Sequence, residues 1–430
     1  MRVAVAGLWH LGLVTAACFA AAGHEVLALA DDHDEAVSLA NAILPIGEPG
    51  LADLVRAGLA SGRLRVSADL AEIRAAEVVC VAYDTPVDDD DHADAAFVLD
   101  RIRRLFPVLG PGTLVLISSQ LPVGSTRAIG VDYALACPDG AATFAYSPEN
   151  LRLGAAIAAF MHPDRVVAGI EASQDRSRIA ALFAPITSEI EWMSIESAEM
   201  TKHALNAWLG LSVAFANEIA TICERVGADA SEVARGVMTD ARVGPRAYLR
   251  PGAAFAGGTL ARDLQFLAER ATAEGLEIAV APAALASNRA HQRWAHRRLR
   301  ELLPDLDGRT IALLGLAYKP GTSTLRRSSS VDLARWLLEQ RARVRAWDPM
   351  AGQLPGDLLG GVSRFDAPEE ALAGADAAVI GTSWPGLRDL DPESVLAAMA
   401  TPIILDPACF LGSTLGSESR IRLISVGRAA

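Results

Sequence analysis

The first 30 residues constrain the fold more than any other part of the chain. Apolar strands are predicted at 2–6 and 25–30, a helix is predicted at 11–22, and the turn after the first strand reads Gly7-Leu8-Trp9-His10-Leu11-Gly12. Glycines in this context are typical of a dinucleotide-binding βαβ unit, because Gly7 suits the tight turn and Gly12 the close contact between helix and strand. The chain is therefore expected to begin a Rossmann-like sheet.

The same apolar run, from Arg2 to Ala22, would also suit a signal peptide. The split into strand, glycine turn and helix, followed at once by a second strand, favours the βαβ interpretation. No other stretch looks long and apolar enough to span a bilayer, so we expect no membrane partner.

The net charge and the cysteine content argue against a nucleic-acid-binding protein, a cysteine-ligated metal site and a disulfide-rich fold. The formal net charge is −13, from 39 basic and 52 acidic residues among 430, which argues against general nucleic-acid binding. The five cysteines are widely spaced, odd in number and without metal-ligand spacing, so no metal is expected. This pattern suits a reducing cytoplasm better than a disulfide framework.

Short apolar strands alternate with helical segments at both ends of the chain. The strands predicted in the first region are 3–6, 26–30, 78–82, 113–118, 143–146 and 166–168. Long helices follow at 198–226 and 263–271, and a second α/β pattern has strands at 309–316, 344–347, 377–382 and 403–406 and a helix at 330–339. Apolar runs without polar alternation indicate parallel strands buried on both faces.

We therefore predict an α/β protein with two Rossmann-like doubly wound domains joined by a helical central region. The predicted parts are a dinucleotide-binding domain at 1–195, a central helical domain at 196–300 and a second α/β domain at 301–430.

The predicted cofactor turn departs from the usual glycine pattern. Trp9 stands where a second glycine would let the backbone approach a pyrophosphate, so the dinucleotide is either retained in a shifted position or lost. The second strand ends at Ala30, where an acid is expected, and Asp31 follows directly. Asp31 could bind a ribose hydroxyl or could serve as a turn and helix-cap residue.

Lys202 and Asn206 lie four residues apart on a predicted helix, so their side chains point to the same side. Such a pair can donate hydrogen bonds to a developing alkoxide or carbonyl oxygen. Alone, the pair would more often be part of a solvated helix face.

Several motifs, in order along the chain, resemble those of the UDP-glucose/GDP-mannose dehydrogenase family. Residues 254–263, Ala-Phe-Ala-Gly-Gly-Thr-Leu-Ala-Arg-Asp, resemble its active-site motif Gly-Phe-Gly-Gly-Ser-Cys-Phe-x-Lys-Asp. Residues 83–86, Tyr-Asp-Thr-Pro, resemble Val-Gly-Thr-Pro, and 147–154, Ser-Pro-Glu-Asn-Leu-Arg-Leu-Gly, resemble Ser-Pro-Glu-Phe-Leu-Arg-Glu-Gly. The similarity covers nearly the full length.

The resemblance implies roles for individual residues. It implies a catalytic set of Lys202, Asn206, Glu149, Asp263 and Thr259. It implies cofactor contacts from Gly7, Trp9, Gly12, Asp31, Thr85, Gln120 and Arg326, with NAD as the cofactor and NADP as an alternative. It implies contacts to a nucleotide-sugar substrate from Arg152, Tyr248, Arg250, Phe255, Gly257 and Lys319. It also implies that the domain at 301–430 binds the nucleotide sugar and that the helical domain at 196–300 forms a homodimer.

Thr259 replaces the family's nucleophilic Cys, which forms a thiohemiacetal with an aldehyde. A hydroxyl needs a nearby base to become nucleophilic, so Thr259 either fills space and bonds to substrate or is activated by Glu149 or Asp263. The predicted function is NAD-dependent hydride transfer on a UDP- or GDP-sugar without this adduct. The alternatives are a catalytically silent nucleotide-sugar-binding paralogue and a redox-neutral sugar epimerase.

Overall fold

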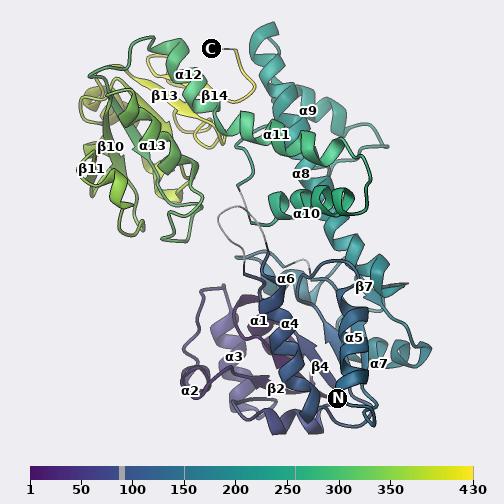
Figure 1. The fold of residues 1–430 in the computed structure, drawn as a ribbon. Coiled ribbons are helices and arrows are strands. Elements are labelled where there is room, and N and C mark those ends of the chain that lie inside the picture. The colour runs from purple at the N-terminus through teal and green to yellow at the C-terminus, as the bar shows by residue number, and fades with distance from the viewer. Residues whose placement is uncertain (87–92, 150, 257, 430) are drawn as a thin grey trace. The chain divides into compact units, whose positions relative to one another are not determined.

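The computed structural model describes residues 1–86, 93–149, 151–256 and 258–429, and the chain forms two compact units, 1–205 and 206–430. Helix α8 (Ile195–Val226) carries the chain from the first unit into the second. Each unit has its own sheet (Figure 1). The three-part division predicted from the sequence stays a prediction.

The first unit is built on an eight-stranded sheet with the order β3-β2-β1-β4-β5-β6-β7-β8. Its strands are β1 (Arg2–Ala6), β2 (Glu25–Leu29), β3 (Leu64–Ser67), β4 (Val78–Val81), β5 (Leu114–Ile117), β6 (Thr143–Tyr146), β7 (Val166–Gly169) and β8 (Ile190–Met193). Parallel pairing places Val3 opposite Val26 on one side and Val78 on the other. The order reverses between β1 and β4, as in a doubly wound sheet.

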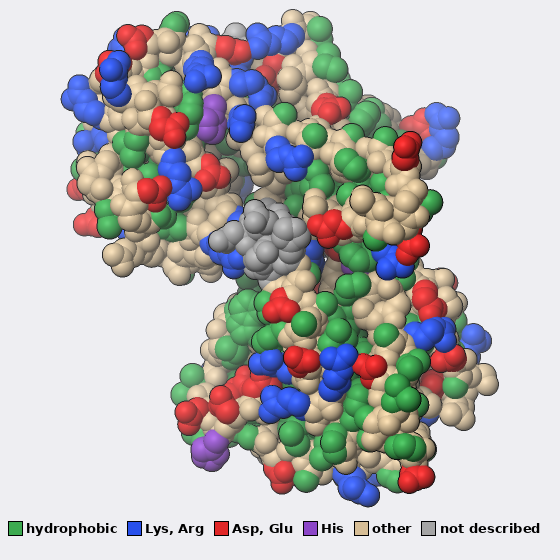
Figure 2. All heavy atoms as spheres, viewed as in Figure 1, with side chains coloured by type: hydrophobic (Ala, Val, Ile, Leu, Met, Phe, Trp, Pro, Cys, Tyr) green, Lys and Arg blue, Asp and Glu red, His purple; other side chains and the backbone are tan. Residues whose placement is uncertain are grey.

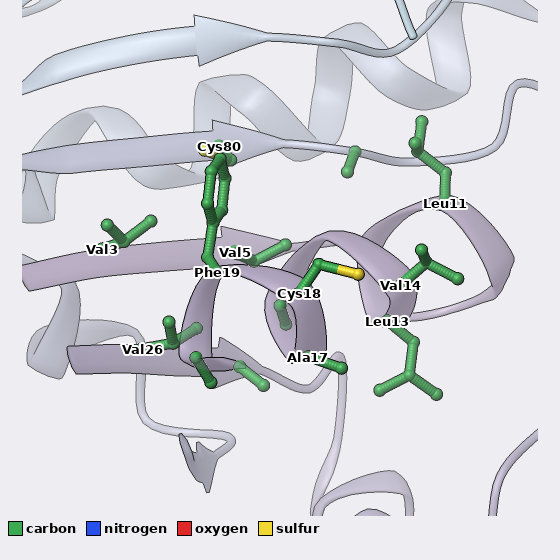
Figure 3. Packing of buried hydrophobic residues seen from close by; sticks show 14 of the residues in the cluster. Val3, Val5, Leu11, Leu13, Val14, Ala17, Cys18, Phe19, Val26 and Cys80 are labelled. Atoms are coloured by element: carbon green, nitrogen blue, oxygen red, sulfur yellow. The ribbon is translucent and has the colours of Figure 1, made fainter. Parts of the chain in front are cut away.

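Helices cover both faces of this sheet. They are α1 (His10–Ala21), α2 (His33–Ala40), α3 (Leu51–Ala60), α4 (Ala95–Leu105), α5 (Ser125–Ala136), α6 (Ala156–Met161) and α7 (Ser173–Phe183). Val3 and Val5 pack with residues of α1 on one face, as Figure 3 shows, whereas Ala4 and Ala6 pack with residues of α4 and α5 on the other. Burial on both faces explains the continuous apolar runs of the central strands.

One pair in this sheet is antiparallel. Tyr146 at the end of β6 pairs with Gly169 at the end of β7, although the apolar pattern predicted parallel strands throughout. Among the described residues between these two strands, helix α6 has six residues and contacts α1.

The second unit begins with helices and ends with a six-stranded sheet. The helices α9 (Ala230–Met238), α10 (Leu260–Ala273), α11 (Val280–Gln292) and α12 (Trp294–Leu302) follow α8. The sheet contains β9 (Thr310–Leu314), β10 (Arg343–Trp347), β11 (Val362–Phe365), β12 (Ala377–Ile380), β13 (Ile403–Asp406) and β14 (Arg422–Ser425), with helices α13 (Ser329–Glu339), α14 (Pro368–Leu372) and α15 (Pro392–Ala398). Its order, β11-β10-β9-β12-β13-β14, is again third-second-first-fourth-fifth-sixth, and all pairs are parallel.

The two sheets confirm the predicted fold class. The helical part between them has a core of its own, in which Ala207 of α8 packs with Leu264 of α10 and Leu285 of α11. No helix within the described ranges is long and apolar enough to cross a bilayer. On the face drawn in Figure 2, acidic and basic side chains are interspersed on each unit.

Candidate active site

The glycine turn of the first unit has the geometry that the sequence predicts. Gly7 follows β1 with φ +90°, and a Cβ added there would lie 2.6 Å from the backbone nitrogen of Tyr83. A Cβ added at Gly12 would lie 1.8 Å from the carbonyl oxygen of Gly7. Both glycines are therefore required, the first by its backbone conformation and the second by close packing of α1 on the turn.

Trp9 stands at the amino end of α1 and points outward. It is the residue before the first helical turn, its side chain makes no capping hydrogen bond, and it is 51% exposed. The backbone N–H groups at the start of this helix are therefore not capped by the residue that precedes them.

Asp84 lies in the loop after β4, which packs against the glycine turn. Although the residue as a whole is exposed, the loss of water around its carboxylate raises the pKa of Asp84, and the carboxylate of Glu149 adds to that rise, whereas the backbone N–H groups of Leu11 and His10 oppose it.

The acid that follows β2 remains accessible. Asp31 accepts hydrogen bonds from the Tyr83 hydroxyl at 3.3 Å and from Arg101 Nε at 3.4 Å, and its side chain is 41% exposed. The helix-cap role considered for Asp31 belongs to Asp32, whose carboxylate accepts from the Glu35 N–H of α2 at 2.9 Å. Asp31 therefore keeps the capacity to accept hydrogen bonds from a ligand.

Two loops predicted to contact the cofactor touch each other. The Thr85 hydroxyl donates to the backbone oxygen of Gln120 at 2.7 Å. The loop that contains Gln120 is in turn held to α8, because the buried Glu199 carboxylate accepts from the N–H groups of Gly124 at 2.6 Å and Thr126 at 2.9 Å. The carboxyl ends of β4 and β5 are thus linked to the start of α8.

Glu48 forms a polar centre that the sequence did not predict. Its buried carboxylate accepts from Gly154 N–H at 2.8 Å and Ala156 N–H at 3.0 Å, and lies 3.1 Å from His10 Nε2. Burial alone would raise the pKa of Glu48, but these hydrogen bonds outweigh burial and hold the pKa below its ordinary value. No local pattern in one sequence reveals a contact between segments 106 residues apart.

Lys202 and Glu149 meet in the first unit. Lys202 is 7% exposed, and its Nζ donates to the backbone oxygen of Glu149 at 2.5 Å and lies 3.8 Å from Glu149 Oε1. Glu149 also accepts a short hydrogen bond from the Leu151 N–H, and Arg152 beside it is exposed. A buried ammonium is costly unless it is paired, and the backbone oxygen and carboxylate of Glu149 supply partners for Lys202.

Asn206 and Asp263 meet in the second unit. Asn206 Nδ2 donates to Asp263 Oδ2 at 2.6 Å, and both residues are buried. Thr259 is the residue that precedes helix α10, where it is exposed and its side chain makes no capping hydrogen bond. Because Asp263 lies one turn further on α10, the Thr259 hydroxyl and the Asp263 carboxylate share one side of the helix.

The other predicted substrate residues of the second unit lie in loops. Phe255 is buried, and its backbone N–H and oxygen bond to the Asn288 side chain at 3.0 and 2.7 Å. Tyr248, Arg250, Lys319 and Arg326 are partly or fully exposed. Gly257 lies outside the described residues.

Models of one known protein family match most of the chain. Three domain models of one family, UDP-glucose/GDP-mannose dehydrogenase, match successive parts of the chain: the NAD binding domain at residues 1–187, the central domain at 196–290 and the UDP binding domain at 312–413.

The chain belongs to the UDP-glucose/GDP-mannose dehydrogenase family.

Individual relatives are similar to the chain over nearly its whole length. A UDP-glucose 6-dehydrogenase of Rhizobium meliloti is 33% identical over 436 residues and covers 100% of both chains. One from Pseudomonas aeruginosa is 34% identical over 421 residues, covering 94% of this chain and 93% of its own. The solved structure of a UDP-glucose dehydrogenase from Pyrobaculum islandicum superposes with a TM-score of 0.88 at 29% identity, over 100% of this chain and 98% of its own.

The protein is therefore an NAD-dependent oxidoreductase of a nucleotide-activated sugar, and the predicted class of enzyme is confirmed. The family match favours oxidation over the silent paralogue and the epimerase. The roles of individual site residues stay predictions, although the structure brings Lys202 to Glu149, Asn206 to Asp263, and Thr85 to Gln120.

Most of the cofactor-binding edge fits NAD. Gly7 and Gly12 form the tight turn and the close helix contact of a dinucleotide-binding unit, and the exposed carboxylate of Asp31 can accept from ribose hydroxyls. The chain departs from the family pattern at two positions beside this edge: Trp9 stands where the turn usually has a second glycine, and Asp84 stands where the family motif Val-Gly-Thr-Pro has glycine.

Proposed function

We propose that the protein oxidises the primary alcohol of a UDP-hexose, with UDP-glucose as the first candidate. The observation that carries the proposal is the pair of buried polar contacts on adjacent turns of α8, Lys202 with Glu149 and Asn206 with Asp263. Relatives that are 33–34% identical over nearly their whole length are UDP-glucose 6-dehydrogenases, which supports this substrate.

Lys202 and Asn206 stabilise negative charge on the substrate oxygen in this proposal. Oxidation of an alcohol removes a proton from the hydroxyl and a hydride from its carbon, so charge develops on oxygen as the reaction proceeds. An ammonium and an amide held by neighbours are already oriented to donate to that oxygen and need little reorganisation. When bound, NAD supplies the hydride acceptor.

Glu149 takes the role of general base. Its carboxylate lies 3.8 Å from Lys202 Nζ, so a proton taken from the substrate hydroxyl would stay close to a compensating positive charge. Carboxylates and lysines positioned in this way commonly transfer protons in such reactions. Asp263 acts as a positioning residue, because its carboxylate fixes the amide of Asn206 at 2.6 Å.

Thr259 binds the substrate without forming a covalent adduct. Its hydroxyl is exposed to water at the start of α10, and the carboxylate one turn away is buried against Asn206. We therefore propose that water adds to the aldehyde, and that the hydrate loses a second hydride and a proton to give the acid. Each sugar then consumes two NAD and one water and releases two NADH.

Product stoichiometry tests this function. Purified protein with limiting UDP-glucose is expected to form two NADH per sugar and an acid product by mass spectrometry, with no sugar bound covalently to the protein after rapid acid quench. Thr259→Val should slow turnover and keep the ratio of two NADH per sugar, whereas Lys202→Ala should abolish turnover. One NADH per sugar with aldehyde released would contradict the second oxidation, and a trapped ester at Thr259 would contradict the non-covalent route.

We further propose that the protein is a homodimer formed through α8. Four large apolar side chains of this helix are more than half exposed at spacings of seven, seven and four residues: Trp208, Phe215, Ile222 and Val226. Such spacing forms one stripe along a helix, and an exposed apolar stripe marks an interaction surface. Sedimentation that shows a monomer at micromolar concentration would contradict this state.

A cytoplasmic location also remains a proposal. The five cysteines Cys18, Cys80, Cys137, Cys223 and Cys409 are all free thiols in the structure. Free thiols without disulfides suit a reducing compartment, and fractionation of the producing cell would test the location directly.

A further inference from the structure

A single buried carboxylate joins the glycine turn to the segment that follows Glu149. Glu48 lies in the loop between α2 and α3, and its side chain is 1% exposed. Its Oε2 lies 3.1 Å from His10 Nε2 and accepts from the Gly154 N–H at 2.8 Å, and its Oε1 accepts from the Ala156 N–H at 3.0 Å. Three parts of the chain that are far apart in sequence therefore meet at one side chain.

The first partner of this carboxylate belongs to the glycine turn. His10 is the first residue of α1 and directly follows Trp9. Burial would raise the pKa of Glu48, but its hydrogen bonds to two backbone N–H groups and to His10 outweigh burial and lower the pKa. Because an ionised carboxylate only accepts hydrogen bonds, His10 Nε2 is the donor in this contact. The contact thus orients the His10 ring at the start of α1.

The second partner is the start of α6. This helix has six residues, and the residue before it, Ala155, makes no side-chain capping hydrogen bond. Backbone N–H groups at a helix start need acceptors from outside the helix, and Glu48 supplies them from a distant loop. The same loop lies against α6 at Gly50, where an added Cβ would be 3.6 Å from Ile157 Cδ1. Both α3 and α6 pack against α1 (Figure 1), so this contact is part of the packed first unit.

Short-range hydrogen bonds extend from the start of α6 back toward Glu149. The Ala155 N–H donates to the Arg152 backbone oxygen at 2.9 Å. The Leu151 N–H donates to the Glu149 carboxylate, and the backbone oxygen of Glu149 accepts from Lys202. The backbone near this acid is therefore held from two sides, by Lys202 and by the capped start of α6.

We propose that Glu48 is a positioning residue for the oxidation: it links the segment that follows Glu149 to the turn that contacts the cofactor. The reaction needs both at once, because a base takes a proton from the substrate hydroxyl while a hydride leaves the carbon that bears it. A displacement of about 1 Å between such groups can slow a reaction about a hundredfold. The proposal rests on the proposed role of Glu149 as general base and is independent of the chemistry at Thr259.

A double-mutant cycle on turnover by the full-length protein tests the proposal. Glu48→Gln keeps the size of the side chain but replaces one acceptor oxygen by an NH₂ donor. It should lower kcat about tenfold to a hundredfold and change the KM for UDP-glucose by less than about twofold. Glu149→Gln should lower kcat by itself. If Glu48 acts through Glu149, adding Glu48→Gln to Glu149→Gln should cost less than about threefold more.

Hydrogen exchange tests the link without turnover and therefore without reference to the sugar. The Gly154 and Ala156 amides should exchange slowly in the wild type and more slowly with NAD, which contacts the glycine turn of such units. Glu48→Gln should speed their exchange about tenfold or more. His10→Ala should remove the effect of NAD on these amides, and His10→Gln, whose amide can still donate to Glu48, should retain it. The comparison of the two His10 variants holds even if Glu48→Gln folds poorly.

Asp175 provides a matched control in the same unit. Its side chain is also 1% exposed, accepts from Thr143 Oγ1 at 2.8 Å and pairs with Arg178. Thr143 is the first residue of β6, so this acid lies at the amino end of the strand that Glu149 follows. Asp175→Asn should lower the melting temperature without changing kcat. Thermal melts of every variant verify that it is folded.

Three outcomes would overturn the proposal. Independent, multiplicative effects of Glu48→Gln and Glu149→Gln on kcat would show that Glu48 does not act through the base. An equal fall of kcat in Asp175→Asn would reduce its role to general stability. Protection of the two amides by NAD that persists in His10→Ala would show that the turn and the segment are not linked through this contact. A wild type that shows this protection but does not oxidise UDP-glucose would instead contradict the proposed function.

Discussion

The two sheets of the molecule share one strand order and one opening turn but use the carboxyl end of the second strand differently. Gly7 after β1 and Gly315 after β9 both have positive φ, and a Cβ on either would lie 2.5–2.6 Å from a backbone nitrogen in the neighbouring loop. An acid follows the second strand in each sheet: Asp348 comes directly after β10, and Asp31 comes one residue later, after Ala30 at the end of β2.

The two acids have opposite surroundings. Asp348 is buried, and its Oδ2 accepts from the N–H groups of Leu316 at 2.7 Å and Ala317 at 2.8 Å and from Trp384 Nε1 at 3.0 Å. Its Oδ1 accepts from two further backbone N–H groups. Among the residues that the structure describes, Asp31 has two long contacts, and its side chain is partly exposed. The acid that follows the second strand therefore holds the loop together in one sheet and is exposed in the other, so topology alone does not locate a ligand site.

The largest effect is expected from Asp348→Ala. Five donors would lose their acceptor, and an unsatisfied buried donor costs about 1–3 kcal/mol, so the second unit should lose about 4–6 kcal/mol of unfolding free energy. Chemical denaturation followed by hydrogen exchange of residues 206–430 measures this loss. The matched variant Asp31→Ala should change stability by less than about 0.5 kcal/mol; equal losses would remove the contrast between the two acids.

Substitution of the glycine in either opening turn should lower stability to a similar extent, but only the substitution in the first sheet should weaken NAD binding directly. Gly7→Ala and Gly315→Ala each force a Cβ into a left-handed residue and a crowded contact, which should cost about 2–3 kcal/mol. Melting curves should show similar losses, each localised to its own unit by hydrogen exchange. Only Gly7→Ala should also weaken NAD binding directly, by more than tenfold. A loss of NAD affinity in folded Gly315→Ala of the same size would argue against the assignment of the cofactor to the first sheet.

A smaller effect is expected from removal of the exposed acid. Asp31→Ala should weaken NAD binding roughly fivefold to tenfold, because a hydrogen bond between a carboxylate and a ribose hydroxyl contributes about 1–1.5 kcal/mol. Calorimetry with NAD measures the change, and binding of UDP-glucose serves as the internal control. Unchanged NAD affinity would leave Asp31 without a role in binding.

The smallest effect is the acid sensitivity of the second unit. Burial would raise the pKa of Asp348, but its hydrogen bonds outweigh burial and lower the pKa below the ordinary value. A lowered pKa stabilises the folded state above the unfolded value of about 3.9, and that contribution is lost as the pH falls through the folded pKa. Denaturation midpoints from pH 6 to 3 should therefore fall, and the fall should be shallower in Trp384→Phe, which lacks one of the donors.

The sequence predicted the centres of both sheets and missed their edges. The strands that escaped prediction are β3, β8, β11 and β14, and each is the outermost strand of its sheet. Edge strands are buried on fewer sides, so their sequences mix polar and apolar residues, as in Leu64–Ser67 and Val362–Phe365. Continuous apolar runs identify only strands that are covered on both faces.

The residues of the candidate site also divide into those that one segment of sequence predicts and those that only the fold brings together. Residues set by local rules, such as Gly7 and Gly12 in the turn, could be predicted from one segment. The contacts of Glu48 with Gly154 and Ala156 join distant parts of the chain, so this acid could not be placed from its own neighbours. The sequence showed that Asp84 replaces a glycine, but only the fold shows that its loop packs against the glycine turn.

The position of Thr259 at the start of α10 has a practical consequence for chemical labelling. Burial raises the pKa of the thiols of Cys18 and Cys80 to about 12 and of Cys409 to about 11, so these groups hold almost no thiolate at neutral pH. A helix start lowers the pKa of a cysteine thiol. The variant Thr259→Cys would therefore carry an exposed thiol that reacts with a maleimide well before those three, and its protection by UDP-glucose would report whether the sugar reaches residue 259.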